Sequence, residues 1–265
     1  MNADELRYLL DRARQLACTA AQAILEFAGD PCATAKEDGS PLTLADMASH
    51  KTIDEGLRSL HPRLSILSEE GDLDGAETRP SGAYWCVDPL DGTKEFVNGL
   101  GEYTVNIALV EQADPVLGVV CVPASSTVYF AARGHGAWRT RGSGPPQRIA
   151  PRDRDRPSVA VVSRSHMSDR TTRFLAKLGV SEVIRRGSSL KMCAVADGSA
   201  DIYPRLGPTC LWDTAAGTAV CREAGCRVVD LHGCDLDYDP GKGLKREGFL
   251  VFPAAMRLPP IEGGD

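Results

Sequence analysis

Two aspartates stand three residues apart at the end of an apolar segment, in the sequence YWCVDPLDGTKEF that runs from Tyr84 to Phe96. The residues up to Val87 have the composition of a buried strand, so Asp88 and Asp91 come together where that strand ends. Two such carboxylates repel each other unless a cation neutralises them. The sequence therefore predicts a cation next to this strand.

The neighbouring residues are those of a divalent-metal and phosphate site. Pro89 fixes φ and turns the chain, which would let both carboxylates and the carbonyl of Leu90 converge on one point. Hard oxygen ligands of this kind suit Mg²⁺. Gly92 permits backbone to approach a ligand closely, and Thr93 is expected to cap the next helix, whose free N–H groups attract an anion. The whole pattern indicates a metal-dependent phosphatase, whereas DP or DG alone indicates only a turn with a helix cap.

Three further acidic residues fit the same site. Glu69 and Glu70, in SEEG, follow an apolar strand, and Asp213, in LWDTAAG, begins a helix of small residues. Each of these positions alone is typical of a solvated strand end or a helix N-cap. Together with Asp88 and Asp91 they supply enough carboxylates for two or three metal ions.

Composition and charge exclude several classes of protein. The chain has 265 residues, 43% hydrophobic and 25% charged, with a formal net charge of -6. This charge does not match a basic nucleic-acid-binding surface, and no apolar run approaches the ~18 residues that span a bilayer. Residues 1–15 are charged and amphipathic, without a signal-peptide core. We therefore expect a cytoplasmic protein with no nucleic-acid polymer and no membrane as partner.

The nine cysteines have no C-x-x-C spacing, and most lie in apolar contexts. We expect them to be reduced and mostly buried, without a zinc site.

The hydrophobic periodicity predicts a layered α/β structure. In the first half, helices are expected over 5–27 and 44–60, a strand over 64–67, and antiparallel strands over 104–110, 115–122 and 127–132. The second half alternates between strands and helices. Its expected strands cover 158–163, 181–186, 200–206, 227–231 and 248–253, and its helices 168–179, 188–198 and 213–225. The polar segment 139–157 is the candidate boundary between domains 1–150 and 151–265.

Two of these segments resemble family signatures. WCVDPLDGTKEFVN, at 85–98, and WDTAAGTAVCREAGC, at 212–226, are similar to the two signatures of the inositol monophosphatase superfamily, the lithium-sensitive, Mg²⁺-dependent phosphatases. The second signature usually ends in Gly or Ala where this chain has Cys226, far from the carboxylate. The resemblance covers nearly the whole chain. It implies the α+β layered sandwich of the inositol monophosphatase and fructose-1,6-bisphosphatase fold, with the active site between the halves.

Within the superfamily, the chain resembles the 3'(2'),5'-bisphosphate nucleotidases more closely. Inositol monophosphatases usually carry other residues at Lys94 and Glu95, and the segments SRSH, GSSLK and YPRLGPT are similar to the nucleotidase branch. The resemblance implies Mg²⁺-dependent hydrolysis of 3'-phosphoadenosine 5'-phosphate to AMP and phosphate, with its sulfated precursor as a second candidate substrate, in sulfur assimilation. It further implies two or three Mg²⁺ ions with Mn²⁺ as a candidate substitute, inhibition by Li⁺ and Ca²⁺, and a homodimer.

The resemblance also implies a role for each matching residue. The metal ligands would be Glu69, Asp88, the carbonyl of Leu90, Asp91 and Asp213. The catalytic residues would be Asp46, Glu69 and Thr93, with the attacking water oriented by Asp46 and Thr93. The phosphate and the nucleotide would be held by Gly92, Thr93, His166, Ser188, Lys191, Arg205 and Asp213.

The residues themselves support only part of this assignment. Lys191 follows Ser188 by three positions, so both are expected on one side of a helix. Arg205 interrupts an apolar strand, which suits either a phosphate contact or a structural ion pair. His166 and Asp46 depend on the resemblance alone.

Two alternative functions remain open from the sequence. One is an inositol-phosphate or fructose-1,6-bisphosphate phosphatase on the same scaffold, which would differ in how the pocket treats the ring and the second phosphate. The other is a non-catalytic metal- or nucleotide-binding regulator. A regulator would be expected to have lost metal ligands, yet every expected carboxylate is present.

Overall fold

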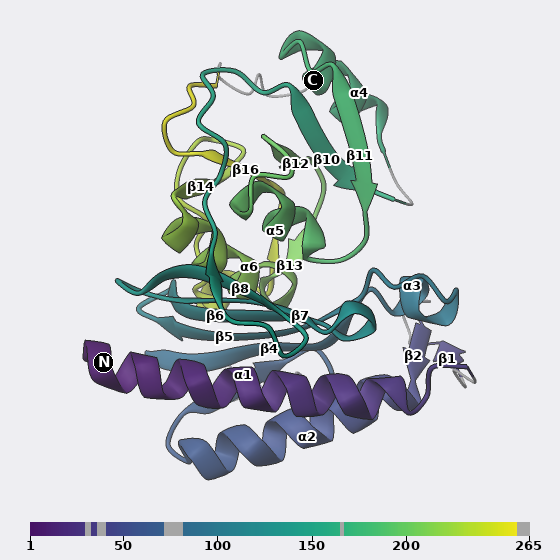
Figure 1. Cartoon of the computed structure of the whole chain (residues 1–265), viewed down its shortest axis with the longest axis vertical. Helices are drawn as coiled ribbons and strands as arrows, with labels where there is room; N and C mark the ends of the chain where they lie inside the picture. Colours follow the sequence, from purple (N-terminus) through teal and green to yellow (C-terminus); the bar gives the residue numbers. More distant parts are fainter. Residues whose placement is uncertain (30–32, 36–40, 72–81, 165–166, 259–265) are drawn as a thin grey trace.

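The computed structural model describes residues 1–29, 33–35, 41–71, 82–164 and 167–258, and these fold into alternating layers of helix and sheet. Figure 1 shows helices α1 (Ala3–Leu25) and α2 (Leu44–Leu60) on one side of a broad sheet and α5 (Leu190–Ala196) and α6 (Leu211–Ala224) on the other. A second group of strands lies beyond α5 and α6. The predicted layered α/β sandwich is confirmed.

The broad sheet has seven strands in sequence order, with β3 and β4 parallel and all later neighbours antiparallel. Its strands are β3 (Ser65–Ser68), β4 (Ala83–Asp91), β5 (Thr104–Glu111), β6 (Asp114–Val122), β7 (Thr127–Ala132), β8 (Gly136–Arg141) and β9 (Gln147–Arg148). The short β1 (Ala33–Ala35) and β2 (Pro41–Thr43) form a separate antiparallel pair. Strands β8 and β9 lie partly within the segment 139–157, so this polar segment belongs to the sheet as far as Arg148.

Both faces of the broad sheet are buried. On β4, Trp85 and Val87 pack toward the face that α1 and α2 cover, whereas Tyr84 and Cys86 pack toward α6. All four are at most 1% exposed. A strand covered on both faces needs apolar residues at every position, and this explains the continuous apolar run before Asp88.

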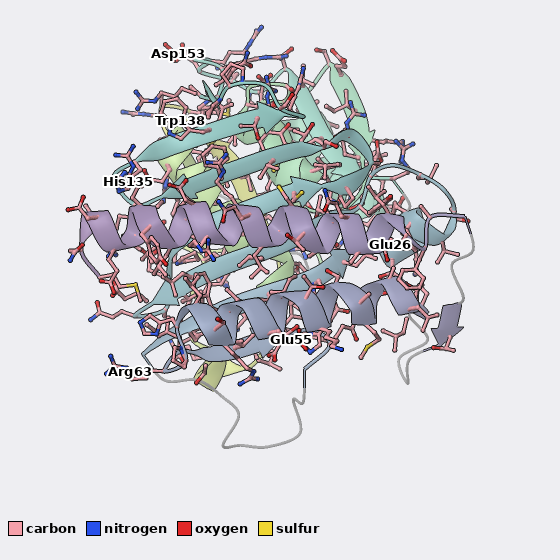
Figure 2. The ribbon with its side chains drawn as sticks, turned by 60° about the horizontal axis from the view of Figure 1, so that its bottom comes forward. Glu26, Glu55, Arg63, His135, Trp138 and Asp153 are labelled. Atoms are coloured by element: carbon pink, nitrogen blue, oxygen red, sulfur yellow. The ribbon has the colours of Figure 1, made fainter. Side chains whose placement is uncertain are left out.

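Helices α1 and α2 lie side by side across one face of the sheet (Figure 2). Asn2 caps α1 by accepting a hydrogen bond from the Glu5 amide at 2.9 Å. Thr43 caps α2, and Asp46, three residues later, completes a capping box with the Thr43 backbone. None of the described helices has the length and apolar character needed to cross a membrane.

The second group of strands contains an antiparallel sheet in the order β12 (Tyr203–Arg205), β16 (Phe249–Pro253) and β14 (Cys226–Asp230). Beside it, β10 (Val159–Ser163) pairs in parallel with β11 (Glu182–Arg186) and reaches Ile202 through a backbone hydrogen bond from Val161. The remaining elements are α3 (Thr93–Val97), α4 (Asp169–Lys177), β13 (Thr209–Cys210) and β15 (Lys245–Arg246), with short 3₁₀ turns at Pro123–Ser125 and Pro240–Lys242. Leu175 of α4 packs onto this sheet.

The largest apolar core is continuous across residue 150. It joins Ala108 and Val120 of the broad sheet to Ala215 and Val220 of α6. The division into 1–150 and 151–265 therefore stays a prediction, and the two segments share one core wherever α6 packs on the sheet.

Helix α6 lies unusually close to β6, because Gly118 has no side chain. A Cβ atom at Gly118 would lie 2.2 Å from the carbonyl oxygen of Ala216 and 2.9 Å from the Cβ of Ala219. This contact fixes the height of α6 above the sheet. It matters for function because α6 carries Asp213 in its first turn.

We predict that Gly118→Ala destabilises the protein, because the added methyl group meets backbone that cannot move aside cheaply. The expected loss is about 2 kcal/mol or more, which lowers the melting temperature by roughly 4–8 °C. Thermal unfolding followed by circular dichroism measures this. Gly207→Ala is the matched control, since a Cβ there meets nothing within 4 Å. Equal melting temperatures for the two variants would contradict the close approach of α6.

Candidate metal-dependent active site

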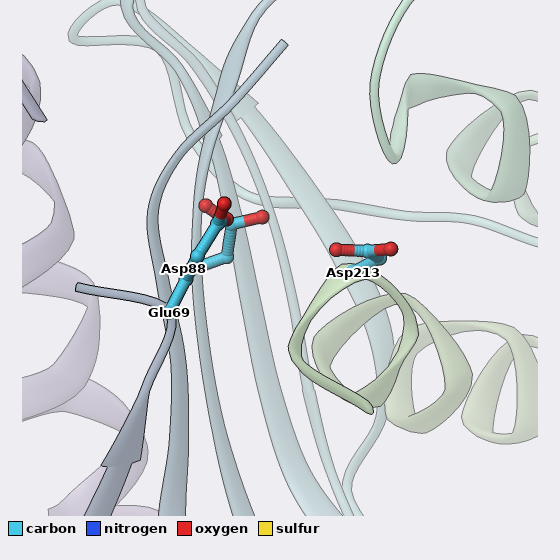
Figure 3. A group of neighbouring side chains, drawn as sticks. All are labelled: Glu69, Asp88 and Asp213. Carbon is cyan, nitrogen blue, oxygen red and sulfur yellow. The ribbon is translucent and has the colours of Figure 1, made fainter. Parts of the chain in front are cut away.

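Three carboxylates meet at the edge of the broad sheet. Carboxylate oxygens of Glu69, Asp88 and Asp213 all lie within 4.8 Å of one another. Figure 3 shows Glu69 and Asp88 projecting from adjacent segments, with Asp213 facing them from the end of a helix. Residues separated by more than 120 positions in the sequence thus form one acidic cluster, which can hold a metal ion.

Parallel pairing of β3 and β4 places Glu69 beside Asp88. The register aligns Ser68 with Val87, and the Glu69 amide continues the ladder by donating to the Val87 carbonyl at 3.2 Å. The residues that follow this pair, Glu69 after Ser68 and Asp88 after Val87, are both acidic. Asp213 completes the cluster as the third residue of α6, where its Oδ2 accepts hydrogen bonds from the Cys210 amide and the Thr209 hydroxyl, both at 2.9 Å.

The electrostatics of the cluster favour a bound cation. Burial raises the pKa of Asp88 well above its usual range, and the charges of Glu69, Asp91 and Asp213 raise it further. Burial and the charge of Asp91 raise the pKa of Asp213 to about 6. Asp88 Oδ2 is buried and has no hydrogen-bond partner among the described residues. An unpartnered carboxylate oxygen among like charges is what a divalent cation would satisfy, so these residues fit a metal.

Asp91 lies outside this tightest set of carboxylates, although its charge raises the pKa of Asp88 and of Asp213. The β4–β5 register is interrupted between Asp88 and Asp91, and the Leu90 amide donates to Asp88 Oδ1 at 3.1 Å. Ser49 holds the bulged segment from α2 by donating to the Pro89 carbonyl at 2.6 Å. The predicted turn of the chain at the DP dipeptide is therefore a bulge within β4, and it redirects the backbone next to the metal cluster.

Thr93 and Asp46 form a hydrogen-bonded pair. The Thr93 hydroxyl lies 3.2 Å from Asp46 Oδ1 and equally far from the Leu90 carbonyl oxygen. Asp46 Oδ2 accepts from both the amide and the hydroxyl of Thr43, so its carboxylate is fixed in place. The expectation that Thr93 caps a helix was wrong. Gly92 is the N-cap of α3, with a left-handed φ of 91°, and Thr93 is the first helical residue.

One pocket brings together most of the predicted substrate residues. It has a volume of about 210 Å³ and is lined by residues that include Asp91, Gly92, Ser188, Lys191, Arg205 and Asp213. His166 lies outside the described residues. The expectation that Ser188 and Lys191 share one side of a helix was wrong, because α5 begins at Leu190 and Ser188 has a left-handed φ of 52°. Both residues nevertheless line the same pocket.

Lys191 is a buried cation in this pocket. The residue is only 7% exposed, and burial lowers the pKa of its ammonium group. Its Nζ donates to the Ser188 carbonyl at 2.5 Å, the one hydrogen-bond acceptor that it has among the described residues. Because an ammonium group carries three donors, two remain for a ligand. Arg205 lies in the same wall and donates to the Pro208 carbonyl at 2.9 Å.

Several residues of the site were missed by sequence reasoning. Glu102 accepts two hydrogen bonds from Arg164, at 2.7 and 2.8 Å, and one from the Gly187 amide at 2.8 Å. These hydrogen bonds link the segment after α3 to Arg164 and Gly187, which line the pocket. A Cβ at Gly187 would lie 2.5 Å from the Glu102 carbonyl oxygen, so the glycine of GSSLK is the signal that could have indicated this contact.

Thr104 and Asn106 were also missed. Both are buried behind the site, at 0% and 1% exposed. They are two residues apart in TVNIALV, so both side chains lie on the same face of the strand. Two polar side chains on one face of an otherwise apolar strand are a recognisable signal of a buried hydrogen-bonding site.

Comparison with known proteins agrees with the geometry of the site. The inositol monophosphatase family pattern matches residues 5–249. The chain belongs to the inositol monophosphatase family. It is 48% identical over 247 residues to the 3'(2'),5'-bisphosphate nucleotidase CysQ of Salmonella typhimurium, covering 92% of this chain and 99% of that protein. Identity to the enzyme of the same name from Escherichia coli K12 is 46%, with the same coverage.

A solved structure of this family has the same fold. The crystal structure of CysQ from Bacteroides thetaiotaomicron, a bacterial member of the inositol monophosphatase family, is similar with a TM-score of 0.81 and 39% sequence identity. The similarity covers 93% of this chain and 97% of that one. The family and the fold expected from the two signatures are therefore confirmed.

We predict that Asp88→Asn stabilises the metal-free protein and removes its response to metal. The amide keeps the shape of the side chain but removes a buried charge that Glu69 and Asp213 repel. The melting temperature without metal should rise by roughly 3 °C, for about 1 kcal/mol of relieved repulsion. Mg²⁺ should raise the melting temperature of the wild type and leave that of Asp88→Asn unchanged.

Asp153→Asn is the matched control, since Asp153 is exposed and remote from the cluster. This variant should respond to Mg²⁺ as the wild type does. An Asp88→Asn variant that is stabilised by Mg²⁺ to the wild-type extent would exclude Asp88 as a ligand.

Proposed function

We propose that this protein is a Mg²⁺-dependent phosphatase that hydrolyses 3'-phosphoadenosine 5'-phosphate to AMP and phosphate. The observation that carries the proposal is a single pocket lined by both acidic and basic side chains. Its lining includes Asp91 and Asp213, of which Asp213 belongs to the metal cluster, and the cations Lys191 and Arg205. A substrate with two phosphate groups matches this lining, with one phosphate at the metal and the other at the cations. The names of the relatives from Salmonella and Escherichia coli describe the same activity.

The metal would be held by oxygen atoms only. The proposed ligands are Glu69, Asp88, the carbonyl of Leu90, Asp91 and Asp213. An all-oxygen set of carboxylates and a carbonyl favours Mg²⁺ over softer metals, with two or three ions as the proposed number and Mn²⁺ as a substitute. When bound, the metal supplies charge neutralisation at the phosphoryl group and lowers the pKa of a coordinated water.

Thr93 and Asp46 would orient the attacking water. The Thr93 hydroxyl donates a hydrogen bond to the Asp46 carboxylate, which leaves the lone pairs of the Thr93 oxygen able to accept a hydrogen bond from a water molecule. Thr43 keeps Asp46 in place for this role. Glu69, a member of the metal cluster, is the third proposed catalytic residue. Gly92 and Thr93 would hold the phosphoryl oxygens where α3 begins.

The second phosphate would bind at Lys191 and Arg205. Two of the Lys191 donors have no acceptor among the described residues, and the low dielectric of a buried site strengthens their attraction for a phosphate oxygen. Ser188 and His166 complete the proposed nucleotide contacts. The proposed role is removal of the by-product of sulfate activation in the cytoplasm, by a homodimeric enzyme.

A substrate panel tests the proposal. We expect the purified protein to release phosphate fastest from 3'-phosphoadenosine 5'-phosphate, more slowly from inositol 1-phosphate and fructose 1,6-bisphosphate, and not from AMP. Activity should be lost with EDTA, return with Mg²⁺, and fall with Li⁺ or Ca²⁺. Ca²⁺ inhibits because its larger and looser coordination misplaces the water. Full turnover in EDTA would exclude the metal mechanism, and a preference for inositol phosphate would move the function to the inositol branch.

Substitutions of the two residues proposed to bind the second phosphate test the nucleotide assignment. We predict that Lys191→Met and Arg205→Ala each lower kcat/KM for the bisphosphate nucleotide by about 10- to 100-fold, since a charge-assisted hydrogen bond contributes roughly 1.5–3 kcal/mol. With inositol 1-phosphate, which lacks a second phosphate, the loss should be much smaller. Methionine keeps the buried volume of Lys191. Measurements at fixed ionic strength avoid differences in screening.

Lys51→Ala, an exposed lysine on α2, serves as the control for a lost positive charge. It should leave both kcat/KM values unchanged. Equal losses on the two substrates would show that Lys191 and Arg205 serve the shared phosphate or the fold.

A further inference from the structure

The carboxylate of Asp91 is held by a loop of the second half of the chain. Asp91 is the last residue of β4, and its backbone pairs with Thr104 just after the interruption in the β4–β5 ladder. Its side-chain Oδ2 accepts hydrogen bonds from the Ser188 hydroxyl and the Ser189 amide, both at 2.7 Å. Because these two bonds occupy Oδ2, the other oxygen, Oδ1, is the one left for a ligand.

Buried hydroxyl groups hold that loop against β5. The Thr104 hydroxyl contacts the Ser188 hydroxyl and lies 2.8 Å from the Ser189 hydroxyl. Ser189 also donates to Asn106 Oδ1 at 2.8 Å. The register places Thr104 opposite Asp91 on the neighbouring strand. We call Thr104, Asn106, Ser188 and Ser189 the hydroxyl network, and its members are between 0% and 9% exposed.

The order of donors in the hydroxyl network follows from counting protons. A carboxylate has no proton to donate, so the Ser188 proton goes to Asp91. Ser188 can then only accept from Thr104, whose single proton faces Ser188 and, at 3.2 Å, Asn106 Oδ1, so none is left for Ser189. The single Ser189 proton goes to Asn106 Oδ1 or to Thr104. The hydroxyl groups of Thr104 and Ser188 point successively toward Asp91, and such aligned donors strengthen one another at the carboxylate.

Ser188 also connects this network to the buried cation Lys191. Its hydroxyl donates to Asp91, and its carbonyl accepts from Lys191 Nζ. Ser188 has a left-handed φ of 52°, which a non-glycine residue adopts only when its surroundings impose it. Thr104 contacts both serine hydroxyls, and Asp91 accepts from Ser188 and Ser189, so these two residues together can impose this conformation.

We propose that Thr104 is a positioning residue that holds Ser188 and Ser189 against Asp91, so that Asp91 presents Oδ1 to the metal. The inference rests on the metal centre of the proposed function. A valine at 104 would fill the same space, but it would remove the hydroxyl that contacts both serines and leave only the Ser189 amide as donor to the Ser188 oxygen. Thr104 thus controls metal affinity without touching the metal or the substrate.

The test measures metal affinity in the absence of any nucleotide. Mn²⁺ is titrated into the full chain, and the free ion is followed by electron paramagnetic resonance. Thr104→Val should weaken Mn²⁺ binding about 10-fold, which is typical for a lost partner of a metal ligand. Thr104→Ser should restore affinity to within about twofold of the wild type, because it keeps the hydroxyl.

Thr140→Val is the matched control, since Thr140 is buried on the same sheet and has no side-chain hydrogen bond among the described residues. It should bind Mn²⁺ like the wild type. Ser189→Ala gives a second test if Thr104→Val fails to fold. It removes one member of the hydroxyl network but keeps the Ser189 amide, and it should weaken Mn²⁺ binding by about threefold, for part of one neutral hydrogen bond.

The outcomes separate this inference from the proposed function. Wild-type Mn²⁺ affinity in Thr104→Val, or in Ser189→Ala where the valine variant does not fold, would overturn the positioning role and leave the phosphatase proposal intact. Equal weakening in the valine and serine variants would show that Thr104 acts through packing rather than through its hydroxyl. No Mn²⁺ binding by the wild type would overturn the metal centre, and this inference with it.

Discussion

Repulsion between buried carboxylates is the constraint on which this structure depends. Glu69 and Asp88 follow neighbouring strand segments and Asp213 begins a distant helix, and the three meet where Asp88 is buried and the other two are half-buried. The rest of the molecule has to supply the free energy that this arrangement costs. It does so through a sheet that is buried on both faces and a helix, α6, that packs directly on it. A divalent cation placed among the carboxylates attracts each of them. Binding it therefore removes the repulsion of the metal-free protein and stabilises the folded state.

The sequence was sufficient for those parts of the site that depend on neighbouring residues. The strand before Asp88, helix α2 and the alternation of the second half follow from local hydrophobic periodicity, and the structure has them at nearly the predicted bounds. The convergence of Glu69 with Asp88 depends instead on parallel pairing of β3 and β4. Asp213 joins them only through the packing of α6. Neither contact is encoded locally. The acidic residues after apolar segments suggested one site, and the resemblance to the family assigned them as metal ligands.

The errors have a common physical origin. Ser188 was expected in a helix because the residues after it have helical periodicity, but hydrogen bonds to Asp91 and Thr104 hold its backbone in a left-handed conformation. Thr93 was expected as a cap because threonine favours that position, yet Asp46 and the Leu90 carbonyl compete for its hydroxyl. In both cases a tertiary hydrogen bond overrides a local preference. Residues whose local preference is overridden in this way cluster around the carboxylates.

The strand order of the second sheet makes the substrate pocket depend on a strand that comes late in the chain. Strand β16 pairs with β12 on one side and β14 on the other, although it follows both in the chain. Phe249 of β16 aligns with Arg205, and both line the substrate pocket. While a ribosome has released only the residues before 249, β12 and β14 have no strand between them, and Arg205 lacks the partner that faces it across the sheet. A nascent chain therefore completes this wall of the pocket only after β16 has been made.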